Sequence, residues 1–554
     1  MVEKSSSLLS NKTSLNSFWQ NIAENFYPQR AFFTKTNPIP YGRDFASHLT
    51  TSFPILVAQE YSSLISAYLR PAGQQWFKIG VENQGKDKEL DNDGKRFLEY
   101  VTKIQTNVIK NRQSGFSIAV DQGDADFASF GQCVISIEID WKNTTLLHRC
   151  WNMRDVAWTQ GPNGLVDYVC REWKTNIRNA RSFFGDKLSP ETLRKASKEG
   201  DSELTIYHIV METEVYYNTY SNDSTENQKI KTPYVSIYVQ LEDNHEIEIV
   251  GSPTIIYYIP RDQLVSGSQY AYSRAVVAAL PDARLLQSIT LSLLEAGEKA
   301  VNPPLLAQED AVRDDISLAA NTINYVSSNE GQRIDDVVKV MNLDKSGLQY
   351  GLTMQADIRE SQRNAFFLNK LSLPQLQGTM TATEVRKRYQ EWIRNASPFV
   401  NRLEQECNQQ LVRMQFETLM HVKAFGYEEE MPESIREDFI KGDIEFSFKN
   451  PLVEAEGEED AQKFLEMKGI IADTAALDPS VANIPEVGVA LRDALEGLGV
   501  PAKWLKSEEA VAELNAAQEQ AQQTQEMIQN MAAGGAAAEQ LGKGAQAIQQ
   551  AEIQ

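Results

Sequence analysis

Residues 270–304 read YAYSRAVVAALPDARLLQSITLSLLEAGEKAVNPP, and this stretch decides the fold because its apolar residues recur at helical spacing. Pro281 followed by Asp282 suits the first turn of a helix, and Asn302-Pro303-Pro304 ends it. At 1.5 Å per residue, a helix over 282–301 would be about 30 Å long. Its apolar face comprises Leu285, Leu286, Ile289, Leu293 and Ala296.

Two further long helices follow this first one. The spacing of apolar residues predicts a helix over about 354–371, and Thr381 with Glu384 fits a capping box that opens another. The latter helix runs to Ala396, where Ser397-Pro398 either kinks it or caps a second segment that ends near Phe425. Residues 305–350, between the first two long helices, are mixed in pattern and contain only short elements.

The part of the chain before residue 270 is predicted to combine helices and strands. Helices are expected over 15–27, 45–69 and 94–111, the last continuing toward Asp126, with a short strand at 76–79. In the middle third, β-branched residues predict strands, and Gly161-Pro162-Asn163-Gly164 predicts a turn between two of them. The expected strands are 133–139, 166–173, 204–213, 234–241 and 255–259, with short helices at 177–184 and 190–197. The middle third is therefore predicted to be an α+β body.

Length and charge limit the possible functions. The chain has 554 residues, enough for about three domains, and a net charge of −22. Residues 425–554 contain 9 Lys+Arg against 26 Asp+Glu, which argues against tight binding of a phosphate backbone. A surface that touches DNA without gripping it is compatible with this charge. No run approaches the about 20 apolar residues of a membrane span, and no signal peptide is visible, so we expect synthesis in the cytosol.

Sequence motifs for catalysis, cofactors and metals are missing. The chain has no P-loop, no dinucleotide-binding glycine motif and no nucleophile elbow. The cysteines (Cys133, Cys150, Cys170 and Cys407) form no C-x-x-C pair, and buried thiols are expected. His148 and Cys150 are two ligands at most, and a pair on a strand surface is the simpler interpretation. Asp124/Asp126 and Asp335/Asp336 are carboxylate pairs of a kind that an acidic chain produces by chance. We predict no enzyme activity and no cofactor.

The densest basic cluster is Arg386, Lys387 and Arg388, on the helix that opens at Thr381. Contact with a polyanion is one interpretation of this triplet. A solvated helix face or ion pairs between subunits is the favoured one.

Five segments of the chain form a recognisable set in a fixed order. They comprise Trp19, Tyr27-Pro28, Asp44, Ala46, Leu49, Ser52, Leu69, Pro71 and Trp76-Phe77; 126–131; 164–172; 272–274, 279–282 and 302–306; and 379–385, Pro398 and 402–406. Together they resemble the podovirus head-to-tail connector family, the portal proteins of short-tailed phages. Tyr272-Ser273-Arg274, at the start of the fourth segment, stands where the family often has Gly-Arg-Gly/Ser, so the entry to the first long helix differs.

The resemblance implies an α+β, mainly helical portal-type fold that assembles as a ring of twelve subunits. It divides the chain into a wing (1–265), a first stem helix (266–302), a clip (303–350) and a second stem helix (351–371). A tunnel loop (372–379), a long wing or tunnel helix (380–425) and a crown (426–506) would follow. Residues 507–554, with 13 Ala and 11 Gln, would be a barrel-like crown extension that meets scaffold or core proteins, or a disordered tail.

The resemblance also implies the function and the partners. Such a ring sits in the virion at one capsid vertex, assembles in the bacterial host cytoplasm, and lets double-stranded DNA pass without sequence specificity. It would nucleate procapsid assembly, contact the major capsid protein and scaffold or internal core proteins, and dock the terminase large subunit and then a tail adaptor protein. Candidate clip contacts are Glu309, Asp310, Asp314 and Asp315. The tunnel loop would present Leu373, Pro374, Gln375, Leu376 and Gln377. Candidate basic residues in the lumen are Lys299, Arg359, Arg363 and Lys370.

Two other classes of protein stay open on the sequence. The acidic helical C-terminus also fits an internal scaffold or core protein, which would not form a closed ring by itself. The carboxylate pairs also fit a metal-dependent nuclease, which would cleave duplex DNA in the presence of Mg²⁺ or Mn²⁺.

Overall fold

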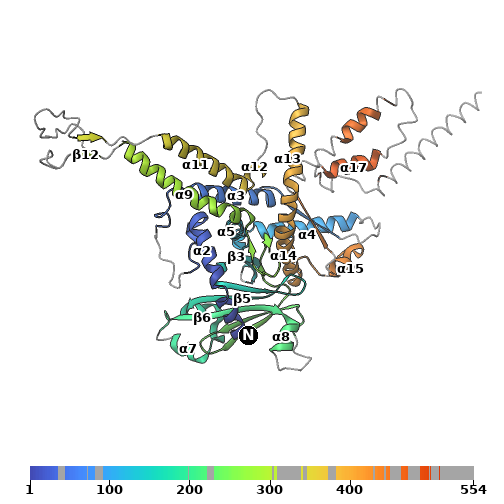
Figure 1. The fold of residues 1–554 in the computed structure, drawn as a ribbon. Coiled ribbons are helices and arrows are strands. Elements are labelled where there is room, and N and C mark those ends of the chain that lie inside the picture. Colours follow the sequence, from blue (N-terminus) through green and yellow to red (C-terminus); the bar gives the residue numbers. More distant parts are fainter. Residues whose placement is uncertain are drawn as a thin grey trace, which may run out of the picture. The chain divides into compact units, whose positions relative to one another are not determined.

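The computed structural model divides the chain into two compact units (Figure 1). The first comprises Met1–Gly80, Val101–Tyr427 and Glu445–Leu452, and the second comprises Val81–Tyr100, Glu428–Ile444 and Val453–Gln554. The structure describes residues 1–34, 44–71, 73–81, 92–141, 143–196, 199–220, 230–301, 305–307, 338–340, 346–371, 382–427, 429, 431–441, 444–449, 463–471, 474, 487–497, 500 and 511.

The first unit begins with helices that mostly follow the sequence pattern. Val2–Ser10 (α1) precedes Thr13–Phe26 (α2), whose Trp19 is fully buried, as the helical spacing predicts. Phe53–Leu69 (α3) starts later than the predicted residue 45. Pro54 occupies the first turn of α3, where its missing N–H costs nothing and its fixed φ suits a helix start.

The helix predicted to run from 94 toward Asp126 is two helices. Asn92–Lys110 (α4) and Phe116–Phe130 (α5) are separated by the 3-10 turn Arg112–Ser114 (η2). Gly115 between them adopts a left-handed φ of 63°, which a glycine reaches without steric cost. The continuous helix was therefore a wrong prediction.

The middle third contains a five-stranded antiparallel sheet, and its α+β character is confirmed in the described residues. Its strand order is β4-β5-β6-β7-β8, formed by Val156–Gln160, Val166–Asn176, Glu203–Glu212, Tyr234–Gln240 and His245–Ser252. The predicted turn at 161–164 joins β4 to β5, and Gly161 N donates to Leu165 O at 2.8 Å. Strands β4 and β8 were not predicted, although the alternation of charged and apolar residues in β8 is itself a strand signal.

Successive side chains of these strands point to opposite faces of the sheet, and both faces carry buried hydrophobic residues. One face carries Tyr168, Ile209 and Ile237 and is covered in part by α1. The other carries Leu204, Ile206 and Ile247 and packs against Ile177–Phe184 (α6) and its neighbour Pro190–Ala196 (α7). A second sheet, of order β3-β2-β9, consists of Thr145–Cys150, Ile135–Asp140 and Tyr257–Tyr258. Two short strands, Phe77–Val81 (β1) and Ile444–Phe448 (β14), pair with each other.

The first long helix, Arg274–Val301 (α9), begins earlier than predicted, and Pro281 lies inside it. The predicted start at Pro281 was wrong because the cap comes from a distant residue: Asp262 Oδ2 accepts the backbone N–H of Arg274 at 3.0 Å. Short strands precede α9, with Gln263–Leu264 (β10) pairing with Ala271–Tyr272 (β11).

The second long helix, Ser346–Ala365 (α11), starts before the predicted residue 354 and ends before the predicted residue 371. Phe367 adopts a φ of 56°, which is unusual for a bulky residue and breaks the helix. Leu368–Leu371 (α12) follows as a single turn. Leu305–Ala307 (β12) and Val338–Val340 (β13), between α9 and α11, pair antiparallel.

The third long helix, Ala382–Leu403 (α13), passes through Pro398 without ending. Ser397 Oγ donates to Ile393 O at 2.7 Å, one turn earlier. The irregularity falls later, in the π-helical turn Glu404–Gln409 (η6), which continues into Gln410–His421 (α14). Thr381, the predicted N-cap, lies outside the described residues.

The second unit contains short helices in its described residues. Phe439 of Glu433–Lys441 (α15) is fully buried and meets Phe97 of α4 edge to face, with ring centroids 5.6 Å apart. Val487–Gly497 (α17) exposes Val487, Val489 and Leu491.

Candidate functional site: the α9–α11 helix pair and its anchors

The helices α9 and α11 lie side by side and run antiparallel (Figure 1). Two hydrogen bonds set their register: Gln355 Nε2 donates to Thr290 Oγ1 at 2.8 Å, and Ser361 Oγ donates to Asp282 Oδ2 at 2.8 Å. Near the other end the helices approach closely, since a Cβ on Gly351 would lie 2.7 Å from Leu293 Cδ2. The predicted pair of long helices flanking an insert is therefore confirmed in the described residues.

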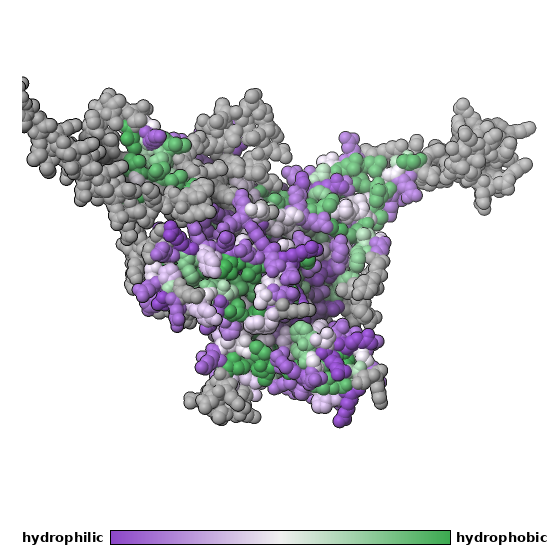
Figure 2. All heavy atoms as spheres, turned by 180° about the vertical axis from the view of Figure 1, so that it is seen from behind, coloured by the Kyte–Doolittle hydropathy of each residue, from purple (hydrophilic) through white to green (hydrophobic). Residues whose placement is uncertain are grey.

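This pair leaves apolar side chains uncovered in the single chain. The sequence predicted one apolar face for α9, but Leu286 of that face is fully buried while Leu285 is 46% exposed. Hydrophobic side chains stand exposed among polar ones along the pair (Figure 2). The exposed apolar residues of α9 and α11 are Val277, Leu285, Leu291, Leu294, Val301, Tyr350, Leu352 and Met354.

By length and composition alone, α9 is apolar enough to cross a membrane, although no run in the sequence approaches about 20 consecutive apolar residues. An 18-residue window has a mean hydropathy of 1.2, and 28% of that window is buried. Single helices of this kind also occur in soluble proteins, where a partner covers the apolar side chains. The helix pair therefore leaves apolar surface uncovered in the single chain.

The side of α9 is anchored to the segment that leads into α3. Gln287 Oε1 accepts the backbone N–H groups of Thr50 and Thr51 at 2.8 and 3.0 Å, and Gln287 Nε2 donates to Thr51 O at 3.0 Å. Thr50 Oγ1 also donates to the carbonyl of Gln287 at 2.8 Å. Every polar atom of this glutamine side chain is thus used to hold α9 beside α3.

The start of α9 is anchored by an arginine–aspartate pair. Arg274 donates from Nε to Asp262 Oδ1 at 3.0 Å, in addition to the backbone cap. Arg402 of α13 donates to the carbonyl of Asp262, so three segments meet there. Gly131, at the end of α5, has a φ of 78°, and a Cβ on it would lie 2.2 Å from Ser273 N.

Two more arginine–aspartate pairs hold α5, the helix that ends at Gly131. Arg70 pairs with Asp124 at 2.5 Å, and Arg30 pairs with Asp126 at 2.6 Å. Burial opposes the charge on each arginine, but the attraction of the partner aspartate outweighs it and raises the pKa of both Arg30 and Arg70. Burial also raises the pKa of Asp124 and of Asp126, and the attraction of each arginine offsets this only in part. Each aspartate is held by its own arginine, so the two do not form a shared acid–base pair.

His148 and Cys150 have separate structural roles. His148 is 3% exposed, so the predicted position on a strand surface is wrong. Its Nδ1 lies 3.2 Å from Ser114 O, and its Nε2 lies 3.0 Å from Gln415 Nε2. Burial lowers the pKa of His148 to about 4, which keeps the ring neutral. Cys150 Sγ donates instead to Asp126 Oδ2 at 3.8 Å.

The described residues contain no group of three or more His, Cys, Asp or Glu side chains that could hold a metal ion. Cys133, Cys170 and Cys407 are buried, as predicted, and Cys150 is partly buried.

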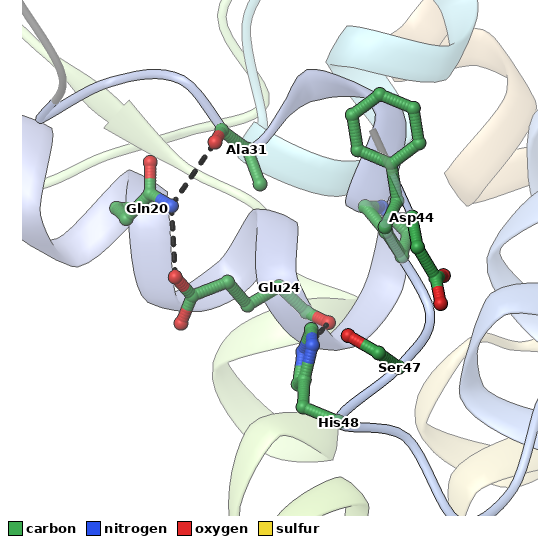
Figure 3. Close-up of a pocket in the computed structure, with 8 residues that line it drawn as sticks. Gln20, Glu24, Ala31, Asp44, Ser47 and His48 are labelled. Atoms are coloured by element: carbon green, nitrogen blue, oxygen red, sulfur yellow. Dashed lines mark hydrogen bonds between the residues drawn. The ribbon is translucent and has the colours of Figure 1, made fainter. Parts of the chain in front are cut away.

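A cavity in the described part of the first unit is small (Figure 3). It has a volume of about 190 Å³ and lies between α2 and residues 44–48. Gln20 Nε2 bridges Glu24 Oε1 and Ala31 O at 2.8 and 3.1 Å, and His48 Nε2 lies 3.4 Å from Glu24 O. Pockets for cofactors and drug-sized ligands usually measure about 300–1,000 Å³, so this cavity is too small for such a ligand.

The predicted basic residues of the lumen lie on the helix pair and just beyond it. Lys299 is exposed in the last turn of α9. Arg359 and Arg363 contact α3: Arg359 Cζ is 5.5 Å from the centre of the Phe53 ring, and Arg363 Nη2 is 3.6 Å from Glu60 Oε2.

Lys370, in α12, has its Nζ 5.8 Å from the centre of the Phe367 ring. In the basic triplet, Arg388 pairs with Glu384 one turn earlier, at 3.6 Å, and Lys387 is exposed. Both observations favour the interpretation of the triplet as a solvated helix face. The predicted clip residues (Glu309, Asp310, Asp314 and Asp315) and tunnel-loop residues (Leu373, Pro374, Gln375, Leu376 and Gln377) lie outside the described residues.

Residues 3–505 match the family of bacteriophage head to tail connecting proteins, and the chain belongs to that family. It is 22% identical over 551 residues to the portal protein of Salmonella phage epsilon15, covering 97% of this chain and 94% of that protein. It is 24% identical over 371 residues to the probable portal protein of Bordetella phage BPP-1, and this match covers 65% of this chain. The match spans 63% of that protein, which is less than two thirds of its length. The family resemblance drawn from the sequence is confirmed.

Solved structures that match include a chain of the virion of a native gene transfer agent particle and a chain of the neck of an empty gene transfer agent particle. Their identities to this chain are 10% and 9%, and their TM-scores are 0.34 and 0.36. The matches cover 78% and 77% of this chain and 91% of each of those chains.

Proposed function

We propose that twelve copies of this protein close into a portal ring at one capsid vertex, through which double-stranded DNA passes during packaging and ejection. The observation that carries the proposal is the antiparallel α9–α11 pair, which leaves Leu291, Leu294 and Leu352 exposed in a member of the head-to-tail connector family. Neighbouring copies around a ring would cover these side chains and remove their apolar surface from water.

The charge of the chain supports a conduit rather than a DNA-gripping protein. Each copy carries a net charge of −22, and a lumen lined by acidic groups repels phosphates. Lysine and arginine contacts to phosphates dominate the affinity of proteins for DNA, so an acidic lumen leaves few sites that would hold a sliding duplex. The basic residues that would supply local attraction along the path are Lys299, Arg359, Arg363 and Lys370.

The assignment of residue ranges to parts of the portal subunit follows the family resemblance. Residues 1–265 and 380–425 form the wing, 266–302 and 351–371 the stem, 303–350 the clip and 426–506 the crown. The clip contacts the terminase large subunit during packaging and a tail adaptor protein afterwards, through its acidic residues. The tunnel loop, 372–379, narrows the lumen and helps to retain DNA. The ring nucleates procapsid assembly and meets the major capsid protein and scaffold or core proteins, with 507–554 extending the crown.

Negative-stain images of the purified full-length protein test this function. We expect annular particles with a central hole, because the proposal requires the helices of neighbouring copies to pack around an axis. Isolated globules or open aggregates would contradict it and would favour an internal scaffold protein. Cleavage of duplex DNA by the same preparation with Mg²⁺ or Mn²⁺, lost in a variant of an acidic pair, would favour a nuclease.

A further inference from the structure

Lys12 lies in the short turn between α1 and α2, and its side chain is buried inside the first unit. Its ammonium nitrogen donates to the carbonyl oxygens of Met153 at 2.8 Å, Arg154 at 2.9 Å and Val156 at 2.5 Å. An ammonium group has three N–H donors. Each donor of Lys12 therefore has an acceptor of its own, and all three acceptors are backbone atoms.

Burial lowers the pKa of Lys12 to about 7, so the ammonium form with its three donors predominates below that pH. Backbone dipoles, rather than a carboxylate, hold this charged form. Within the described part of the chain, no carboxylate forms an ion pair with Lys12, and the nearby Asp155 is paired with Arg154 at 2.7 Å. Buried ammonium groups are stable only where hydrogen bonds or opposite charges replace water. Three converging carbonyls provide such an environment, in the way that carbonyl oxygens commonly coordinate cations.

The three carbonyls lie at the start of an edge strand of the five-stranded sheet. Val156 is the first residue of β4, which is an edge strand, and Met153 and Arg154 form the 3-10 turn (Met153–Asp155, η3) before it. Edge strands leave backbone groups unpaired unless another part of the protein covers them. Lys12 donates hydrogen bonds to the carbonyls at the start of this edge strand.

The helix that precedes Lys12 has only modest contacts of its own with the sheet. Ser5 Oγ is 2.7 Å from Tyr168 Oη, and Lys4 Nζ is 4.1 Å from the centre of the Tyr168 ring. Leu8 and Leu9 pack against the same sheet face but remain partly exposed. The N-terminus lies beside β5 and β6 (Figure 1). Lys12 adds three buried hydrogen bonds to these contacts of the N-terminal segment with the sheet.

We propose that the carbonyls of Met153, Arg154 and Val156 form a binding site for a primary ammonium group, that Lys12 is its built-in ligand, and that this contact fixes α1 on the sheet. The ligand class follows from the geometry, because three acceptors around one nitrogen match a group that carries three N–H bonds. A quaternary ammonium ion has the same charge but no donor and would not fit. The proposal is independent of the ring.

Hydrogen exchange of the full-length protein tests the site in the variant K12A. This substitution removes the side chain beyond Cβ, which corresponds to n-propylammonium. We expect amide protection in α1 to fall at least about tenfold, while β6 and β7 keep theirs. Added n-propylammonium chloride should restore protection in α1, and tetramethylammonium chloride at the same concentration should not.

Two more variants complete the test. K12M fills the volume of the lysine stem without a donor, so it should lose protection in α1 without rescue by n-propylammonium. K110M removes an exposed lysine from the end of α4 and should leave α1 unchanged. Wild-type protection of α1 in K12M, or equal rescue of K12A by the two ammonium salts, would overturn the proposal. Loss of protection in β6 and β7 together with α1 would also overturn it, because the ammonium would then support the whole unit.

Discussion

The guanidinium of Arg70 binds both carboxylate oxygens of Asp124 through Nη2, at 2.5 and 2.6 Å. Its Nη1 donates to Asn408 Oδ1 at 3.1 Å, and Asn408 Nδ2 donates to the carbonyl of Leu69 at 2.7 Å. The end of α3 is thereby tied both to α5 and to the π-helical turn after α13. Arg30–Asp126 likewise ties the turn after α2 to α5, and Arg274–Asp262 ties the start of α9 to the segment before it.

Removing the charge of Asp124 should destabilise the first unit strongly. In D124N the buried Arg70 would lose its counter-ion, and breaking a buried pair typically costs about 3–5 kcal/mol. The free energy of unfolding, followed by tryptophan fluorescence in urea, measures the effect. The matched control is D201N, which removes an exposed partner of Arg178, 3.2 Å away, and should cost less than about 1 kcal/mol. Equal losses in the two variants would contradict the anchoring role.

Gly131 should tolerate alanine much less well than Gly164. Both glycines have nearly the same φ, 78° and 77°, but a Cβ at Gly131 would meet Ser273 N at 2.2 Å, whereas a Cβ at Gly164 would meet nothing within 4 Å. G164A should therefore cost only the backbone strain, about 1–2 kcal/mol, and G131A should cost more and displace the start of α9. Thermal unfolding of the two variants compares them directly, and similar shifts in Tm would refute this account of the junction.

New charges on the exposed leucines of α9 should prevent ring closure without unfolding the subunit. Leu291 and Leu294 are 48% and 59% exposed in the single chain, so L291D and L294D cost little there but bury a charge between copies in the ring. Analytical ultracentrifugation should show loss of the large oligomer, with an unchanged circular dichroism spectrum. S182D, which adds the same charge on the exposed face of α6, is the control. Normal rings in both leucine variants would exclude α9 from the subunit interface.

Stability should fall in acid partly because of His148. Burial lowers its pKa from 6.5 to about 4, so between these values the unfolded chain binds a proton that the folded chain does not. The contribution of His148 is fully present above pH 6.5 and is lost as the pH falls toward 4, by at most about 3 kcal/mol.

Urea unfolding between pH 7 and pH 4 measures this dependence. In H148Q the slope of unfolding free energy against pH should be shallower than in the wild type, although buried His208, whose pKa burial also lowers, remains in both proteins. Identical slopes in H148Q and the wild type would contradict a lowered pKa of His148 in the folded protein.

Deleting Gln375–Gln377 should separate DNA packaging from DNA retention. The proposed tunnel loop narrows the lumen, so a shorter loop should allow packaging and then let DNA leak from filled heads. Packaged DNA per particle, measured by nuclease protection soon after packaging and again after incubation, distinguishes the two steps. Wild-type retention by the deletion variant would remove this role from the loop.

Sequence reasoning found the elements whose signals are local. Helix α6 has the predicted bounds Ile177–Phe184, with Asn176 as its N-cap, and the turn at 161–164 is defined by its own glycines. The start of α9 was missed because its cap, Asp262, lies twelve residues before Arg274 and across two short strands. Pro281, a strong local signal, suggested a start in what is the middle of the helix.

The anchors of the helix pair had no signal that a single sequence could provide. Arg30 and Asp126 are 96 residues apart, and Arg70 and Asp124 are 54 apart. In an acidic chain, Asp124 and Asp126 looked like a chance pair because nothing local indicates an arginine partner. Likewise, Lys12 is an ordinary lysine in a polar turn, and only the fold brings the three carbonyls to its nitrogen.

The mass of the native assembly tests the central claim most directly. Native mass spectrometry of the purified full-length protein should give one dominant species of twelve copies of the 62.4-kDa chain, about 749 kDa in total. In a closed ring every subunit contacts a neighbour on each side. The twelve-copy species should therefore persist on dilution. A dominant 62.4-kDa monomer, or a ladder of open oligomers without a closed species, would contradict the portal ring.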